Sequence, residues 1–133
     1  YPRGSTLENL TFTNAVTHSG TGNALNNLIT GNSASNVLSG LDGNDTLNAN
    51  ENNDTLLGGT GNDTYVFNAA GDVATELANE GIDTIRSTVS INLGNAKHAN
   101  IENVVLLGAS RISATGNAEA NLLPNSKTLC AKL

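Results

Sequence analysis

The chain has few of the residues from which a conventional core is built. Its 133 residues include two Phe and two Tyr, and there is no Trp or Met. A large core of bulky side chains is therefore excluded. A single cysteine, Cys130, excludes an intramolecular disulfide. No apolar run approaches membrane-spanning length, so we expect no transmembrane segment.

Positive charge is also scarce. Six Lys and Arg stand against twelve Asp and Glu, which gives a formal net charge of −6. The six basic residues are scattered and make no basic stripe, so nucleic acid is excluded as a partner. Carboxylates crowded onto one structure repel one another until a cation lies between them. The charge therefore favours cations as ligands.

What the chain does contain is a nine-residue repeat. Five units run head to tail from residue 22 to residue 66, with the sequences GNALNNLIT, GNSASNVLS, GLDGNDTLN, ANENNDTLL and GGTGNDTYV. The eighth place of each unit is apolar and is occupied in turn by Ile29, Leu38, Leu47, Leu56 and Tyr65. The sixth place is occupied by Asn27, Asn36, Asp45, Asp54 and Asp63. A period of nine is too short for a repeat built from two helices.

Each unit divides into a turn of six residues and a strand of three. Gly, Asn and Asp suit the turn because they tolerate positive φ or bond to their own backbone. The middle residue of each triplet is expected to point inward. Two turns and two strands make an eighteen-residue coil. The sequence therefore predicts an all-β fold, a right-handed parallel β-roll (a β-helix solenoid) of nonapeptide repeats with flanking capping strands.

A longer repeat overlies the short one. Residues 7–30 align without gaps to residues 101–124, with ten identities in 24 places at an offset of 94. This predicts one full module and the start of the next, as in a tandem array. We expect residues 1–5 to be a tag remnant, 6–21 an N-terminal capping segment, 22–93 the β-roll with its closing strands, and 94–133 a linking segment and the start of a second module. The roll ends are expected to be covered by Leu7, Leu10, Phe12, Ile101, Val104 and Leu106.

The repeat units resemble the haemolysin-type calcium-binding repeats of RTX proteins. The unit GGTGNDTYV matches the pattern G-G-x-G-x-D-x-U-x of that family. The stretches LENL and ANEGIDTIRSTVS resemble linking segments of long secreted or surface-attached bacterial members. The resemblance implies that Ca²⁺ is the cofactor and lies between turns eighteen residues apart. It further implies that the lower turn gives its second and fourth carbonyls, the upper turn its first and third, and each turn its sixth-place Asp.

Carried onto this chain, the resemblance implies three calcium sites. The strongest would use Leu41, Gly43 and Asp45 below with Gly58, Thr60 and Asp63 above. A second would pair Asn50, Asn52 and Asp54 with Phe67, Ala69 and Asp72. A third would join Gly59, Gly61 and Asp63 to the turn that ends at Asp83, after a two-residue insertion. The chemistry is consistent, because Ca²⁺ takes about six to eight oxygen ligands from carboxylates and backbone carbonyls.

The first two units depart from the family pattern. Asn27 and Asn36 stand where Asp is expected, so we interpret these coils as metal-free or weakly binding and held by stacked amide side chains. Replacing Asn36 with Asp is expected to complete a two-carboxylate pair with Asp54 and to add calcium affinity or a bound ion. Two interpretations stay open for the remaining acidic residues near the turns: they are additional ligands, or, for most of them, solvated surface charges. These residues are Asp42, Glu51, Glu76 and Glu80.

The function indicated is a calcium-binding structural module of a secreted RTX-like protein, and not an enzyme. We expect it to be largely unfolded in low-calcium cytosol, as suits type I secretion, and to fold and stiffen outside the cell or on the cell surface. Its expected partners are calcium ions and neighbouring repeat modules of the same chain. Two alternatives stay open. Threonines such as Thr46, Thr55 and Thr64 would form an adhesive face for carbohydrate, a cell surface or ice, or the chain would be the accessory C-terminal domain of a secreted enzyme.

Overall fold

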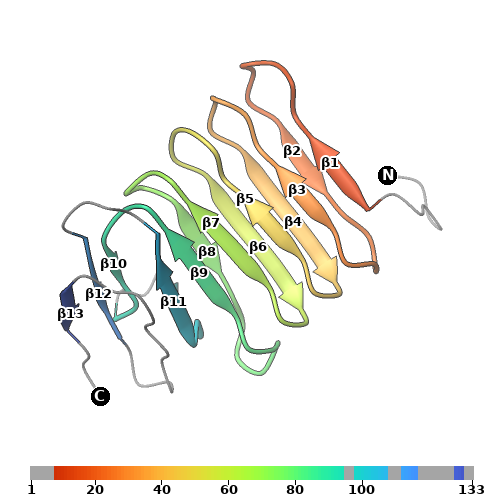
Figure 1. Ribbon diagram of the computed structural model, residues 1–133. Coiled ribbons are helices and arrows are strands. Elements are labelled where there is room, and N and C mark those ends of the chain that lie inside the picture. Colours follow the sequence, from red (N-terminus) through yellow and green to blue (C-terminus); the bar gives the residue numbers. More distant parts are fainter. Residues whose placement is uncertain (1–7, 95–97, 108–111, 117–127, 131–133) are drawn as a thin grey trace.

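Short strands, separated by turns, make up the described part of the chain. The computed structural model describes residues 8–94, 98–107, 112–116 and 128–130. The strands are β1 (Asn9–Thr11), β2 (Ser19–Thr21), β3 (Leu28–Thr30), β4 (Val37–Asp42), β5 (Thr46–Asn48), β6 (Thr55–Thr60), β7 (Thr64–Phe67), β8 (Val73–Thr75), β9 (Thr84–Ser87), β10 (Ile91–Asn92), β11 (Asn103–Leu106), β12 (Ser113–Thr115) and β13 (Thr128–Cys130). The coils follow one another along a single stack (Figure 1).

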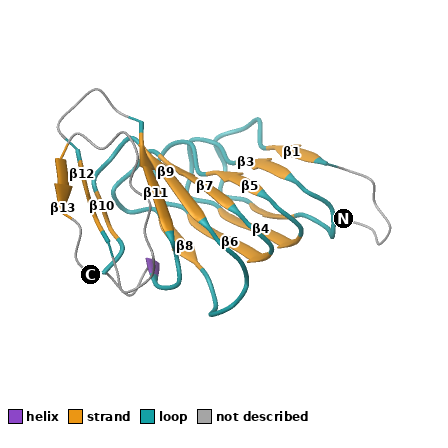
Figure 2. Ribbon diagram, turned by 60° about the horizontal axis from the view of Figure 1, so that its bottom comes forward, coloured by secondary structure: helices purple, strands orange, loops and turns teal. Residues whose placement is uncertain are grey.

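Successive strands alternate between two sheets, and every pairing between described strands is parallel. One sheet has the order β1-β3-β5-β7-β9-β11 and the other the order β2-β4-β6-β8, while β10, β12 and β13 form a third sheet. The two rows of strands are visible in Figure 2. The predicted all-β architecture, a solenoid consistent with a parallel β-roll, is confirmed.

The register reproduces the eighteen-residue coil. Ile29 pairs with Leu47 and Leu47 pairs with Tyr65 in one sheet, while Leu38 pairs with Leu56 in the other. Tyr65 then pairs with Ile85, because the turn before Asp83 contains two additional residues. The stack absorbs this insertion in a loop and keeps the strands aligned.

The core is a narrow ladder of inward side chains. The eighth-place residues Ile29, Leu38, Leu47, Leu56 and Tyr65 are all fully buried, as the repeat predicts. At the ends of the stack, Leu10 and Phe12 pack against this core, and Ile101, Val104 and Leu106 are buried within it. Leu7 lies outside the described residues. Each apolar residue contacts those of the neighbouring coils. Each additional coil therefore lengthens the core, and bulky side chains are not needed to build it.

The two copies of the longer repeat form strands at matching positions in the sequence. Strand β1 of the first copy and β11 of the second form opposite edges of the six-stranded sheet, and β2 corresponds to β12 at the same offset. Residues 1–5 and the end of the second copy, 117–124, lie outside the described part. Within the described residues, no helix is long and apolar enough to cross a membrane.

Candidate metal centre

Sixth-place side chains form a ladder along each side of the roll. The backbone N–H of a sixth-place residue donates to the carboxylate of the sixth-place residue one coil further on. On one side the N–H groups of Asn27, Asp45 and Asp63 donate to Oδ1 of Asp45, Asp63 and Asp83 at 2.7, 2.7 and 2.8 Å. On the other side Asn36 and Asp54 donate to Asp54 and Asp72 at 2.5 and 2.9 Å. These bonds hold the carboxylates in register.

The second oxygen of three of these carboxylates has no hydrogen-bond partner. Oδ2 of Asp45, of Asp54 and of Asp63 is buried and unbonded, and each residue is only 1% exposed. An unpaired buried charge is strongly unfavourable, because neither water nor a donor compensates its lost hydration. A cation beside these oxygens would supply the missing partner.

The turns that carry these three Asp residues have a distinctive backbone. Their second and fourth places all have positive φ: Leu41 (83°) and Gly43 (106°), Asn50 (72°) and Asn52 (68°), Gly59 (96°) and Gly61 (123°). Positive φ is uncommon for residues other than glycine. We call these three turns, residues 40–45, 49–54 and 58–63, the open turns.

Three other turns are closed by their own sixth residue. Asn27 Oδ1 accepts the N–H of Asn23, and Asn36 Oδ1 accepts that of Asn32, both at 2.9 Å. Asp72 Oδ2 likewise accepts the N–H groups of Asn68 and Ala69. None of the second and fourth places in these turns has positive φ. We call residues 22–27, 31–36 and 67–72 the closed turns.

Backbone oxygens surround the free carboxylate oxygens. A Cβ placed on Gly40 would lie 2.2 Å from Asp45 Oδ2 and 2.8 Å from the carbonyl oxygen of Gly58. A Cβ on Gly59 would lie 2.0 Å from the carbonyl oxygen of Leu41, so that carbonyl faces the coil above. At Gly40 and Gly59 a side chain would enter the space between these oxygens. The open turns therefore provide a small cradle of carbonyl and carboxylate oxygens, which are the ligands that calcium prefers.

Burial raises the pKa values of the carboxyl groups in these ladders. Desolvation raises the pKa of Asp54 to about 6 and that of Asp83 to about 6, although backbone hydrogen bonds act in the opposite direction. It raises the pKa of Asp63 to about 7, and the negative charges of neighbouring carboxylates add to the rise. The pKa values of Asp45 and Asp72 are raised for the same main reason. In the absence of a cation these groups resist ionisation in the folded chain.

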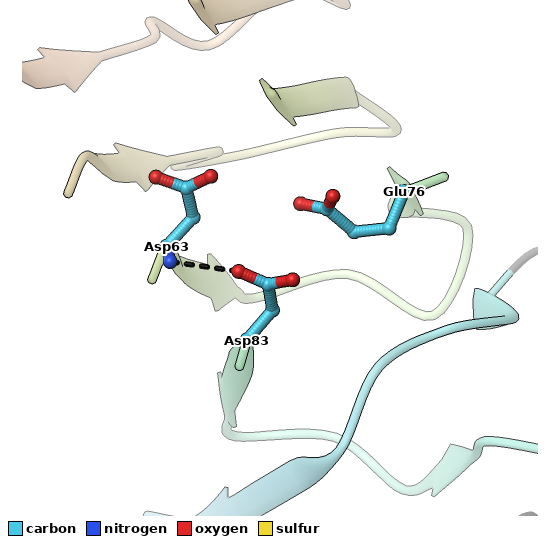
Figure 3. Close-up of side chains that lie close together, drawn as sticks. All are labelled: Asp63, Glu76 and Asp83. Carbon is cyan, nitrogen blue, oxygen red and sulfur yellow. Dashed lines mark hydrogen bonds between the residues drawn. The ribbon is translucent and has the colours of Figure 1, made fainter. Parts of the chain in front are cut away.

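A third carboxylate joins Asp63 and Asp83. One ligand oxygen from each of Asp63, Glu76 and Asp83 lies within 4.8 Å of the other two, and all three residues are buried. Figure 3 shows Glu76 extending its carboxylate toward the two Asp side chains. Burial, followed by repulsion from neighbouring carboxylates, raises the pKa of Glu76 to about 9. Among the described residues this is the one group of three or more acidic, His or Cys side chains with a geometry able to hold a metal ion.

Comparison with protein families, like the geometry of the turns, indicates calcium binding. The RTX calcium-binding nonapeptide repeat (four copies) matches residues 21–56 and, in an overlapping match, residues 30–65. Residues 21–65 are RTX repeats. Such repeats bind Ca²⁺ and serve as structural calcium-binding modules. Comparison with curated proteins and with solved structures gave no significant match.

The structure places the residues of the strongest predicted RTX site on two open turns. Asp45 and Asp63 occupy neighbouring rungs of one ladder, joined by the 2.7 Å bond from the Asp45 N–H. The N–H of Gly43 donates to the carbonyl of Thr60 at 3.0 Å, so the two turns are in direct contact. The carbonyl oxygen of Leu41 lies beside Gly59, and that of Gly58 lies beside Gly40. The six residues are therefore brought together.

The second predicted site combines an open turn with a closed one. Asn50, Asn52 and Asp54 belong to the open turn at residues 49–54. In the turn above, both oxygens of Asp72 already accept backbone N–H groups. The carbonyls of Phe67 and Ala69 also accept backbone bonds, from the N–H groups of Thr88 and Asp72. This pair of turns offers a cation one free carboxylate oxygen, that of Asp54, whereas the first pair offers two, those of Asp45 and Asp63.

The third predicted site has an open turn below and the longer turn, residues 76–83, above. The N–H of Gly61 donates to the carbonyl of Glu80 at 2.7 Å, and a Cβ on Gly81 would lie 1.8 Å from the carbonyl oxygen of Gly61. Asp63 and Asp83 are adjacent rungs of the ladder. Gly59 contributes its positive φ to the open turn.

Two further acidic residues lie beside this ladder, and the repeat pattern assigned neither of them to a site. Glu76 is only 6% exposed, so for this residue the surface-charge interpretation is wrong and the alternative of an additional ligand stays a prediction. Its place in the register held the signal: Leu57 pairs with Thr75, so Glu76 stands where Gly58 stands one coil earlier. Glu102 also extends the ladder, since its Oε2 accepts the N–H of Asp83 at 2.7 Å.

Proposed function

We propose that this chain is a calcium-dependent structural module whose roll folds and stiffens when calcium is bound outside the cell. The observation that carries the proposal is the set of buried, unpartnered oxygens on Asp45, Asp54 and Asp63. These groups destabilise the metal-free roll, and they are stacked so that a cation between coils would relieve them. Folding and calcium binding are then one linked equilibrium.

The donor set supports calcium over other cations. The cradle is made of carboxylate and carbonyl oxygens, with no sulfur or imidazole among the described acidic cluster. Calcium accepts six to eight oxygens at about 2.3–2.6 Å in flexible geometry, whereas magnesium requires near-octahedral ligands at about 2.0–2.1 Å. The residues that would hold calcium are those of the three predicted sites, with the two open turns at residues 40–45 and 58–63 the best prepared.

Calcium is low inside the cell and higher outside, so the linkage between folding and calcium binding would let the chain fold only after export. A chain that remains unfolded in the cytosol suits export through a type I secretion channel, and it would then fold at the cell surface or in the medium. Extracellular calcium modules are commonly tuned to about 10⁻⁴–10⁻³ M. The equivalent positions of β1 and β11 at the two edges of one sheet support neighbouring modules of the same chain as partners. We propose no catalytic role for the module itself.

Circular dichroism with and without calcium tests this proposal. In chelator the chain is expected to show weak β-structure and a low melting temperature, and millimolar calcium is expected to raise both. Magnesium at the same concentration serves as the control and is expected to do little. Full β-structure and an unchanged melting temperature in chelator would overturn the proposal.

A further inference from the structure

We propose that the carboxylate of Glu76 is itself a metal ligand, and that it joins Asp63 and Asp83 of the third predicted site to form a three-carboxylate site. This inference rests on the proposed calcium-binding function and adds a ligand that the repeat pattern does not contain. The pattern places only a backbone carbonyl at the position of Glu76.

Glu76 occupies the first place of its turn, where the two preceding open turns on this side have glycine. In those turns a side chain at the first place would collide with the sixth-place carboxylate, since a Cβ on Gly58 would lie 2.3 Å from Asp63 Oδ2. The turn from Glu76 to Asp83 is two residues longer than the repeat, as the register between Tyr65 and Ile85 shows. The longer turn accommodates a side chain at this place, and the side chain it accommodates is acidic.

The Glu76 carboxylate is directed inward toward other carboxyl groups, namely those of Asp63, Asp83 and Glu80. Both of its oxygens are buried and have no hydrogen-bond partner, and the residue is 94% shielded from solvent, being 6% exposed. Asp63 Oδ2 beside it is also unpartnered. A glutamate kept only for packing or for a turn would place its oxygens on N–H groups or in water. Two converging, unpartnered carboxylates at ligand spacing point to a cation instead.

The additional carboxylate changes what the site binds best. The site between Asp45 and Asp63 has two carboxylates, whereas this one has three, with Glu80 adding negative charge nearby. Calcium affinity rises with the number of charged ligands. We therefore expect this site to bind calcium most tightly in the roll and to bind a trivalent lanthanide more tightly still.

Terbium luminescence and calcium calorimetry test the assignment. Tyr65 is a suitable sensitiser, because its hydroxyl and Asp63 Oδ2 lie 2.2 and 2.3 Å from the same point above Gly58. Glu76→Gln is expected to weaken the tightest calcium and terbium site at least about tenfold while leaving the remaining sites unchanged. Glu51→Gln, at an exposed position on an open turn of the other side, is the matched control and is expected to bind as the parent does.

A second variant separates ligation from general charge. Glu76→Asp keeps the charge but withdraws the carboxylate by one methylene, so a ligand role predicts weakened binding, whereas a purely electrostatic role predicts binding like the parent. Circular dichroism in calcium establishes that each variant is folded. If the parent binds calcium and both Glu76 variants bind it with the same stoichiometry and affinity, the ligand role is overturned while the proposed function stands. If the parent binds no calcium, both proposals fail.

Discussion

Sixth-place Asn and Asp residues differ in one group of the side chain: Asn has an amide NH2 where Asp has a second carboxylate oxygen. Asn27 accepts from its own turn through Oδ1 and donates through Nδ2 to Asn23 Oδ1 at 3.1 Å. An ionised Asp has no N–H to donate, so beside the carbonyl oxygen of Gly58 the Oδ2 of Asp45 finds only another acceptor. The amide is satisfied by the protein alone, whereas the carboxylate requires a cation.

Replacing Asp63 is expected to have opposite effects with and without calcium. Asp63→Asn removes a carboxylate that is proposed to serve two sites, so calcium affinity should fall at least about tenfold at each. In chelator the same change should raise the melting temperature, because a buried, unpartnered carboxyl group becomes a neutral amide. Calorimetry and thermal melts measure the two effects.

Asp42→Asn provides the control for Asp63→Asn. Asp42 is exposed, and it accepts the hydroxyl of Thr60 at 2.7 Å rather than facing the cradle. Calcium affinity and metal-free stability should both remain close to those of the parent. If Asp42→Asn lost as much calcium binding as Asp63→Asn, the eighteen-residue register of the sites would be wrong.

The raised pKa values predict how the metal-free fold depends on pH. Unfolded Asp titrates near 4, whereas the folded pKa is about 6 for Asp54 and Asp83 and about 7 for Asp63. The folded state therefore holds these protons more tightly, and the resulting stability is fully present below about pH 4 and is lost as the pH rises through 6 to 7. Melting temperatures in metal-free buffer should fall from pH 4 to pH 7.5. A flat or rising profile would contradict the assigned burial of these groups.

At the scale of the element, the shape of a turn matters as much as its sixth residue. Asp72 has the sequence feature of a calcium ligand, yet its turn is closed and both carboxylate oxygens accept N–H groups. Asp54, nine residues away along the pattern from Asp45, sits on an open turn and keeps a free oxygen. A carboxylate is left free for metal only where the backbone turns its N–H groups away.

This distinction revises the expectation for Asn36. Asn36 belongs to a closed turn and already accepts the N–H of Asn32. In the variant Asn36→Asp, the new carboxylate should accept backbone N–H groups of its own turn, as that of Asp72 does. The variant is therefore expected to bind the same number of calcium ions as the parent. Calorimetric stoichiometry measures this. One additional ion per chain would show that the sixth residue alone selects the turn.

The sequence was sufficient to predict the coil, the inward ladder and the sixth-place carboxylates, because a strict period fixes which residues repeat on each face. The shape of each turn was not predictable in the same way. Leu41 and Asn50 adopt positive φ without being glycine, and the nine-residue pattern does not indicate this conformation. The period is unbroken up to Thr75, but the repeat pattern assigns only a backbone carbonyl to the next place, so it did not predict an inward carboxylate at Glu76.

At the scale of the whole molecule, the roll is a one-dimensional stack in which each coil contacts only its neighbours. The coils near residues 22–39 have satisfied turns, whereas the coils from residue 40 to residue 86 hold the unpartnered oxygens. Calcium should therefore slow amide hydrogen exchange most strongly between residues 40 and 86, with a smaller change at residues 22–39. Exchange followed by mass spectrometry, with and without calcium, measures this gradient. A uniform change along the chain would argue against it.

The most direct test of the account is a crystal structure of the calcium-loaded chain with anomalous scattering to locate the ions. We predict one ion between the open turns that carry Asp45 and Asp63, and another among Asp63, Glu76 and Asp83. The unpartnered oxygens of Asp45 and Asp63 should then lie at calcium-ligand distances of about 2.3–2.6 Å. Ions found only at exposed carboxylates such as Asp42 and Glu51, with the buried oxygens still unpartnered, would contradict the account.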